Sequence, residues 1–224
     1  MAIIGMTKTF FITGTDTNIG KTTSIVALTK YYQNHNKSVL SLKPIATGCH
    51  LENNVLYNSD ALALQLASNL DTEYNEINPF RFLPPVSPHL VNNDPGNLVT
   101  VEHLVQHCSD MIAKYQPDYC LIEGAGGWLC PLNNTEYLSD LVLKLDIPVI
   151  LVVGIKLGCL NHAMLTVRAI QNQKVKIHGW IANCLESSQD FDSASNIEYL
   201  KTHITDSLLG IIDYDSDSSE FLCL

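Results

Sequence analysis

Short apolar runs rich in β-branched and aromatic residues alternate with segments of helical periodicity along most of the chain. Several of these runs are continuously apolar, as expected for strands whose sheet is covered by helices on both faces. The strands are expected at residues 9–13, 38–42, 119–122, 148–153, 177–182 and 208–212. Because strand and helix alternate, the pattern predicts an α/β fold: a doubly wound, mainly parallel sheet with helices on both faces.

The clearest helix is expected over residues 101–115, where apolar side chains recur at i, i+3, i+4 and i+7. They are Val101, Leu104, Val105, Cys108, Met111, Ile112 and Tyr115. The same spacing over residues 138–145 and 160–170 predicts two further helices. These helices follow predicted strands, so they are expected to cover the sheet.

The alternation of predicted strands and helices is interrupted between about residues 69 and 99, where helical and strand periodicity is weak. This stretch holds Pro79, Pro84, Pro85, Pro88 and Pro95. So long a connection without regular structure inside a compact domain is usually functional or mobile, and we expect this excursion near a substrate site. The acidic residues from 213 onward predict a solvated tail over 213–224. Since no internal repeat is visible, residues 1–224 are expected to form a single domain.

Composition excludes several classes of partner. Lys and Arg number 13 against 23 Asp and Glu, a formal net charge of −10, and 46% of residues are hydrophobic. An acidic chain with no basic block lacks the cations that nucleic acids or anionic membranes require. The longest strongly apolar run, residues 147–155, is far shorter than the roughly 20 residues of a membrane span. Neither nucleic-acid nor membrane partners are expected.

The cysteines point to a reducing compartment. None stands in a C-x-x-C pair or at a zinc-ligand spacing, and no basic region precedes the first apolar residues. The seven cysteines are Cys49, Cys108, Cys120, Cys130, Cys159, Cys184 and Cys223. An odd number without these spacings is typical of reduced thiols, so a cytoplasmic location is expected.

The sharpest chemical signal is the segment 14–22, Gly-Thr-Asp-Thr-Asn-Ile-Gly-Lys-Thr, between the first strand and a helix. In such a loop, backbone N–H groups point at phosphates, Lys21 bridges the outer phosphates, and the Thr22 hydroxyl ligates Mg²⁺. The segment departs from G-x-x-x-x-G-K-T in one place, because Thr15 stands where the pattern has glycine. We interpret it as a nucleotide-binding P-loop; the alternative is a glycine turn with a surface lysine.

Three further charged residues are candidates for the same site. Glu123 directly follows a predicted strand and precedes Gly-Ala-Gly-Gly, which favours a metal ligand over an ordinary loop acid. Asp60 is either a metal ligand or part of a helix N-terminal cap. Lys43 ends the second strand, which we expect beside the first, and is either a second active-site cation or a solvated lysine.

Other catalytic chemistries receive no support. His89 and His162 lack neighbours at metal-ligand spacing and are expected to be structural. Cys130 and Cys159 have no adjacent base, and there is no Gly-x-Ser-x-Gly elbow, so a serine or cysteine nucleophile is not expected.

With these motifs in this order, the sequence closely resembles the dethiobiotin synthetases over roughly residues 8–212. The matching blocks are 14–22, 43–48, 58–62, 78–79 with 87–89, 123–128, 152–162 and 179–183. The resemblance implies a P-loop NTPase-type fold and a homodimeric cyclo-ligase. It also implies conversion of 7,8-diaminopelargonate, carbon dioxide and MgATP to dethiobiotin, ADP and phosphate, through a carbamate and a carbamic-phosphoric anhydride.

The resemblance also implies roles for individual residues. Around the carbamate and γ-phosphate it implies Thr17, Lys21 and Lys43 as catalytic residues. For Mg²⁺ it implies Thr22, Asp60 and Glu123. For the diamine it implies Thr47, and for its distal carboxylate Leu157, Gly158 and Asn161, acting across the dimer interface. For ATP it implies Asn18, Ile19, Gly20, Lys21, Thr22, Thr23, Asp60, Glu123, Gly124, Ala125, Gly126, Asn183, Cys184, Asp213, Tyr214 and Asp215.

The chain departs from the family pattern around the nucleotide base. Asn18 replaces a common glutamate, Cys184 replaces a familiar aspartate after Asn183, and residues 213–215 replace a more apolar segment. Phosphate chemistry is therefore better supported than base selectivity. Two alternatives stay open: an amidotransferase-coupled ligase, disfavoured because no glutaminase domain is present, and an ATPase that positions partners without a small-molecule product.

Overall fold

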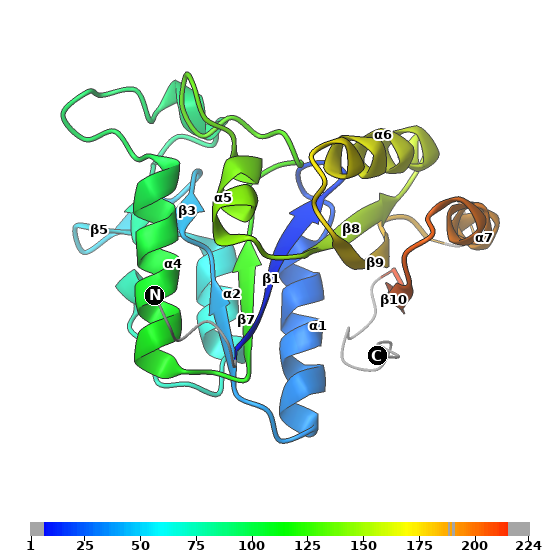
Figure 1. Cartoon of the computed structure of the whole chain (residues 1–224), viewed down its shortest axis with the longest axis horizontal. Coiled ribbons are helices and arrows are strands. Elements are labelled where there is room, and N and C mark those ends of the chain that lie inside the picture. The colour runs from blue at the N-terminus through cyan, green and yellow to red at the C-terminus, as the bar shows by residue number, and fades with distance from the viewer. Residues whose placement is uncertain (1–6, 188, 190, 215–224) are drawn as a thin grey trace.

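The computed structural model describes residues 7–187, 189 and 191–214. Its centre is a six-stranded sheet in the order β10-β9-β8-β1-β7-β2 (Figure 1). The strands are β1 (Lys8–Gly14), β2 (Val39–Leu42), β7 (Tyr119–Glu123), β8 (Val149–Ile155), β9 (Ile177–Cys184) and β10 (Leu208–Ile212). All five pairings are parallel. The parallel α/β sheet and all six expected strands are therefore confirmed.

The expected neighbour of the first strand is wrong. β2 pairs with β7, and β7 in turn pairs with β1, so a strand from much later in the chain separates the first two. Periodicity identifies a strand but carries no information about its partner, which depends on long-range packing. β2 is consequently an edge strand of the central sheet.

The larger helices pack against the sheet in pairs. They are α1 (Lys21–Asn34), α2 (Ser59–Ala67), α4 (Val101–Tyr115), α5 (Leu138–Leu145), α6 (Cys159–Asn172) and α7 (Ser193–His203). α1 packs on α2, α4 on α5, and α6 on α7. In Figure 1, β1 and β7 lie between α4 and α5 on one side and α1 on the other. Every residue of β8 is buried, as expected for a strand covered on both faces.

Short elements occupy the segments that carry no clear periodicity. Residues 69–99 hold α3 (Tyr74–Ile77), β6 (Phe80–Arg81) and the 3₁₀ turn η1 (Pro88–Leu90). β6 pairs with β3 (Ile45–Ala46), and β4 (His50–Glu52) forms a hairpin with β5 (Val55–Tyr57). The segment thus holds a few short elements that the sequence did not predict, because elements of two to four residues are too short to show a period.

The acidic tail lies mostly outside the described residues: Asp213 and Tyr214 are exposed, and residues 215–224 are not described. Among the helices of the described part, none is long and apolar enough to cross a membrane.

Candidate active site

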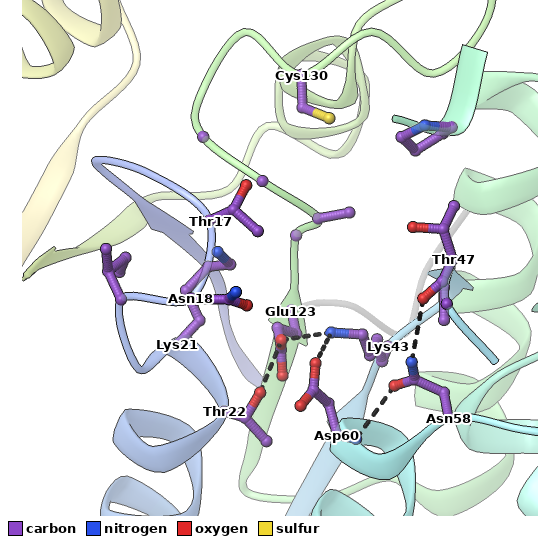
Figure 2. Close-up of a pocket in the computed structure, with 18 of the residues that line it drawn as sticks. Thr17, Asn18, Lys21, Thr22, Lys43, Thr47, Asn58, Asp60, Glu123 and Cys130 are labelled. Carbon is purple, nitrogen blue, oxygen red and sulfur yellow. Dashed lines mark hydrogen bonds and ion pairs between the residues drawn. The ribbon is translucent and has the colours of Figure 1, made fainter. Parts of the chain in front are cut away.

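A pocket of about 900 Å³ opens where β1, β2 and β7 end (Figure 2). It brings together most of the residues expected from the sequence. These are Thr17, Asn18, Ile19, Gly20, Lys21, Thr22, Thr23, Lys43, Thr47, Asp60, Glu123, Gly124, Ala125 and Gly126. Since parallel strands end at one edge of a sheet, residues far apart in sequence meet there.

The loop between β1 and α1 has the geometry of an anion cradle. Gly20 precedes α1 with a φ of 86°, a left-handed conformation that glycine adopts at little cost. No side chain caps the N-terminus of α1, so its first N–H groups are available for phosphate oxygens. The Lys21 ammonium donates to the backbone oxygen of Asp16 at 3.2 Å. Burial lowers the pKa of Lys21, and the nearby Lys43 charge adds to this effect while Glu123 opposes it.

Lys43 lies between two carboxylates. Its ammonium is 2.6 Å from Glu123 Oε1 and 2.8 Å from Asp60 Oδ2. Burial by itself lowers the pKa of Lys43, but Glu123 and Asp60 outweigh it, so the pKa is raised and the ammonium stays charged. The alternative of a solvated lysine is wrong, because only 5% of Lys43 is exposed. Glu123 ends β7, the strand between β1 and β2, and it connects Lys43 with the P-loop threonine.

The backbone around Lys43 is held on both sides. Its N–H donates to the Ile77 carbonyl at 3.0 Å, and its own carbonyl accepts from Asn78 Nδ2 at 2.6 Å. The excursion that includes α3 therefore fixes the end of β2. These two hydrogen bonds give the segment a direct structural role at the end of β2.

Asp60 lies in the first turn of α2, and it is not the cap. The N-cap is Asn58, whose side-chain oxygen accepts from the N–H groups of Asp60 and Ala61 at 3.1 and 3.2 Å. The cap interpretation of Asp60 is wrong, and its carboxylate points to Lys43 instead (Figure 2). Asn58 was missed as a pocket residue, although its type and its place before Ser-Asp-Ala are a recognisable cap signal.

The oxygen donors of this cluster fit a divalent cation. The Thr22 hydroxyl donates to Glu123 Oε1 at 3.0 Å, and Asp60 reaches the same cluster through Lys43. Glu123 is 1% exposed, and its Oε2 is buried without a hydrogen-bond partner, which leaves an acceptor available for a ligand. Two carboxylates and a hydroxyl are hard oxygen ligands of the kind Mg²⁺ uses alongside water and phosphate. Within the described residues, no group of three His, Cys, Asp or Glu side chains could hold a metal alone.

Thr17 and Thr47 lie on opposite sides of the pocket, with Cys130 above them (Figure 2). The Cys130 Sγ is 4.0 Å from Ser87 Oγ, and burial raises the pKa of the Cys130 thiol. The pocket residues that were not expected are Ala46, Gly48, Asn58, Ser59, Pro85, Val86, Ser87, Pro88, Gly127, Leu129 and Cys130. Several belong to the Pro-rich excursion, so part of this segment lines the pocket.

Of the residues expected around the nucleotide base, Asn18 lines this pocket, whereas Asn183, Cys184, Asp213 and Tyr214 do not. Asn183 and Cys184 end β9 and are buried, and burial raises the pKa of the Cys184 thiol. Asp213 and Tyr214 follow β10 and are exposed, while Asp215 lies outside the described residues. Asn183 and Cys184 thus end β9, two strands away from β1, although Asn183 reaches the loop after β1 through a hydrogen bond to the Ile19 carbonyl.

The expected carboxylate segment is also separate from the pocket. Leu157 and Gly158 precede α6 and are exposed, with Leu157 84% exposed. Asn161 lines a second cavity of about 280 Å³, formed by α6 and α7. The cavity is lined by Leu160, Asn161, Met164, Leu165, Arg168 and Tyr199. Within one chain, Thr47 and Asn161 therefore belong to different cavities.

The strand, loop and helix around Lys21 and Thr22, at the edge of a parallel sheet, define a P-loop α/β protein. Solved structures with the same fold include MinD in the MinC:MinD cell division complex of Aquifex aeolicus, with a TM-score of 0.57 at 14% identity, covering 95% of this chain and 85% of that one. FlhF complexed with GMPPNP and Mg²⁺ matches with a TM-score of 0.55 at 12% identity, covering 97% and 70%. A model of the AAA domain matches residues 8–220.

Curated relatives give the family. The ATP-dependent dethiobiotin synthetase of Pseudoalteromonas translucida is 40% identical over 211 residues, 94% of this chain and 92% of its own length. The enzyme of the same name from Wigglesworthia glossinidia brevipalpis is 38% identical, covering 96% and 94%. ATP-dependent dethiobiotin synthetase 1 of Salmonella typhimurium is 43% identical over 88% and 84%. This chain belongs to the dethiobiotin synthetase family.

Proposed function

We propose that this protein is an ATP-dependent cyclo-ligase that converts 7,8-diaminopelargonate, carbon dioxide and ATP to dethiobiotin, ADP and phosphate. The observation that carries the proposal is the buried Lys43 ammonium, held by Asp60 and Glu123 beside the P-loop. The names of relatives matching more than nine-tenths of the chain support the same activity.

The reaction follows three steps. One amine of the substrate captures carbon dioxide as a carbamate. A carbamate oxygen then attacks the γ-phosphorus, ADP leaves, and a carbamic-phosphoric anhydride results. The second amine attacks the carbonyl carbon, expels phosphate and closes the cyclic urea. Phosphorylation turns a poor leaving oxygen into a good one.

Lys21, Lys43 and Thr17 are the proposed catalytic residues. Phosphoryl transfer accumulates negative charge on the transferred oxygens, so cations held rigidly beside them lower the barrier. Lys43 is suited to this because its two carboxylates keep it charged at a buried position. Lys21 and the N–H groups of the loop hold the phosphates, and Thr17 faces the cavity from the loop side.

Thr22, Asp60 and Glu123 are the proposed Mg²⁺ ligands. The unpartnered Glu123 Oε2 supports this assignment, because a buried carboxylate oxygen without a donor is costly unless a ligand satisfies it. When bound there with ATP, Mg²⁺ would neutralise phosphate charge and so favour attack at phosphorus.

We propose that the active enzyme is a homodimer. The diamine is expected at Thr47 and its distal carboxylate at Leu157, Gly158 and Asn161, yet these groups line different cavities of one chain. A second copy would bring its own α6 N-terminus to the pocket. The exposed apolar side chains of Leu157 and Leu165, just before and on α6, support an interface there, since burial of an exposed leucine is favourable.

We further propose that the chain is one domain and resides in the cytoplasm. The support is chemical: the six described cysteines are free thiols, as expected under reducing conditions. They are Cys49, Cys108, Cys120, Cys130, Cys159 and Cys184.

Product analysis by mass spectrometry tests the function directly. The purified protein is incubated with diaminopelargonate, ¹³C-bicarbonate and MgATP, and reactions without ATP or without the diamine serve as controls. We expect a dethiobiotin peak one mass unit heavier than with ordinary bicarbonate, formed in equal amount with ADP. ADP released without dethiobiotin would contradict the proposal and favour an ATPase that positions partners.

A further inference from the structure

Asn183, at the end of β9, reaches the phosphate loop. Its side-chain Nδ2 donates to the backbone carbonyl of Ile19 at 2.9 Å, and Asn183 is only 6% exposed. A carbonyl oxygen can only accept, so the amide nitrogen is the atom that faces it. A residue expected at the nucleotide base therefore has a contact with the loop that surrounds the phosphates.

Glycines make this contact possible across an intervening strand. β8 lies between β9 and β1, and Gly154 of β8 is directly paired with Asn183. A Cβ at Gly154 would lie 2.7 Å from Ile19 Cγ2, and a Cβ at Gly14 would lie 2.7 Å from Ile19 Cδ1. The Ile19 side chain is fully buried in the space that these glycines leave. Its side chain is thus held by packing, and its carbonyl is held by Asn183.

The position of this carbonyl matters because of peptide geometry. The Ile19 C=O and the Gly20 N–H belong to one planar trans peptide and point in opposite directions. Fixing the carbonyl on Asn183 therefore fixes the direction of the Gly20 N–H. Glycine tolerates several backbone conformations, so this peptide could rotate readily if nothing held it. The packing is tight, since a Cβ at Gly20 would lie 2.1 Å from Asn183 Nδ2.

We propose that Asn183 is a positioning residue for the phosphate loop. Its amide holds the peptide between Ile19 and Gly20 in the orientation that binds phosphate, before any nucleotide arrives. This inference rests on the proposed nucleotide binding and extends it: Asn183 contributes to the affinity for the phosphates even where the ligand has no base.

Inorganic triphosphate with Mg²⁺ is the probe, because it carries the phosphates and lacks the base. Calorimetric affinities for it and for ATP are compared in the wild type and in Asn183→Leu, which keeps a similar volume but removes the donor. Asn183→Ala is the second variant, and the exposed Asn172→Ala on α6 is the control. We expect both ligands to bind about 3- to 10-fold more weakly in both variants, the size expected for loss of one hydrogen bond. The control should match the wild type.

Other outcomes overturn the proposal. Weaker binding of ATP with unchanged binding of triphosphate would show that Asn183 contacts only the base. Unchanged affinity for both ligands would show that Asn183 does not position the phosphate loop. A wild type that binds neither ligand would contradict both this proposal and the proposed function. Binding without dethiobiotin formation would contradict the proposed function alone.

A measurement on the wild type covers the case in which neither variant folds. Exchange of the Asn183 side-chain amide protons is followed by NMR in the triphosphate complex, where no base can protect them. A protected proton supports the contact with Ile19, and rapid exchange of both protons would overturn it.

Discussion

The two ends of the proposed substrate site differ in how complete they are within one chain. At the phosphate end, Lys43 and Glu123 are almost fully buried and their charges are paired. At the carboxylate end, Leu157 is 84% exposed, and Gly158 and Asn161 are exposed as well. The proposed phosphate site is therefore complete within one chain, whereas the proposed carboxylate site is open to solvent, which is why we propose that a second copy completes it.

Replacing Lys43 gives the largest expected effect. Lys43→Ala should lower turnover by about 10²–10³-fold, because it removes a cation aimed at the charge that develops on the transferred phosphoryl group. ATP affinity should change little, since Lys21 and the loop amides bind phosphate independently. Steady-state kinetics and calorimetry separate the two effects, with the exposed Lys144→Ala as control.

A fall in ATP affinity as steep as the fall in turnover would contradict this division of roles at the phosphate end. It would mean that Lys43 acts mainly in binding.

The second prediction concerns the base. A pocket discriminates strongly only where the wrong base leaves a buried polar group unpaired. Cys184 is a weak partner, and Asp213 and Tyr214 are exposed. We therefore expect GTP and CTP to support the reaction with kcat/KM within about a hundredfold of ATP. Turnover assays at subsaturating concentration of each triphosphate measure this ratio of kcat/KM values. A preference for ATP above about a thousandfold would reveal base contacts beyond these residues.

The third prediction tests the incomplete end. Asn161→Ala should raise the KM for the diamine by about 10-fold, as expected for a lost hydrogen bond to a charged group, and leave the KM for ATP unchanged. Asn172→Ala, on the same helix, is the matched control.

Sedimentation should show a dimer at micromolar concentration. A fully active monomer would contradict the proposed dimer, because both ends of the substrate site would then lie within one chain.

The smallest expected effect is the dependence on pH. Burial lowers the pKa of Lys21 below the usual 10.5, whereas the carboxylates around Lys43 outweigh its burial and raise its pKa. As pH rises toward 10, Lys21 should lose its proton first, so kcat/KM for ATP falls while kcat at saturating ATP stays level. Profiles of both constants check this. A parallel fall of kcat would show that Lys21 or Lys43 also loses its proton in the ATP complex over this range.

Much of the fold and of the phosphate end could be predicted from the sequence because their signals are local. Continuous apolar runs mark β1, β7 and β8, and the glycine-lysine-threonine loop needs only its neighbours to be recognised. Lys43 and Glu123 stand at strand ends, and parallel strands bring their ends to one edge whatever their order. For that reason the cluster was predicted even though the neighbour of β1 was not.

The tertiary structure alone decided the contacts between distant residues. Strand order places β7 between β1 and β2, Asn58 rather than Asp60 caps α2, and Asn183 binds Ile19 from 164 positions away. The strands β3 and β6 have two residues each and pair with one another, and two residues are too few to show a period. Most residues of the strands, the helices and the phosphate loop could be recognised in the sequence, since periodicity and loop chemistry act over a few positions. The contacts between these elements depend on tertiary packing. A hydrogen bond or a shared cavity depends on positions in space, and no local sequence pattern contains that information.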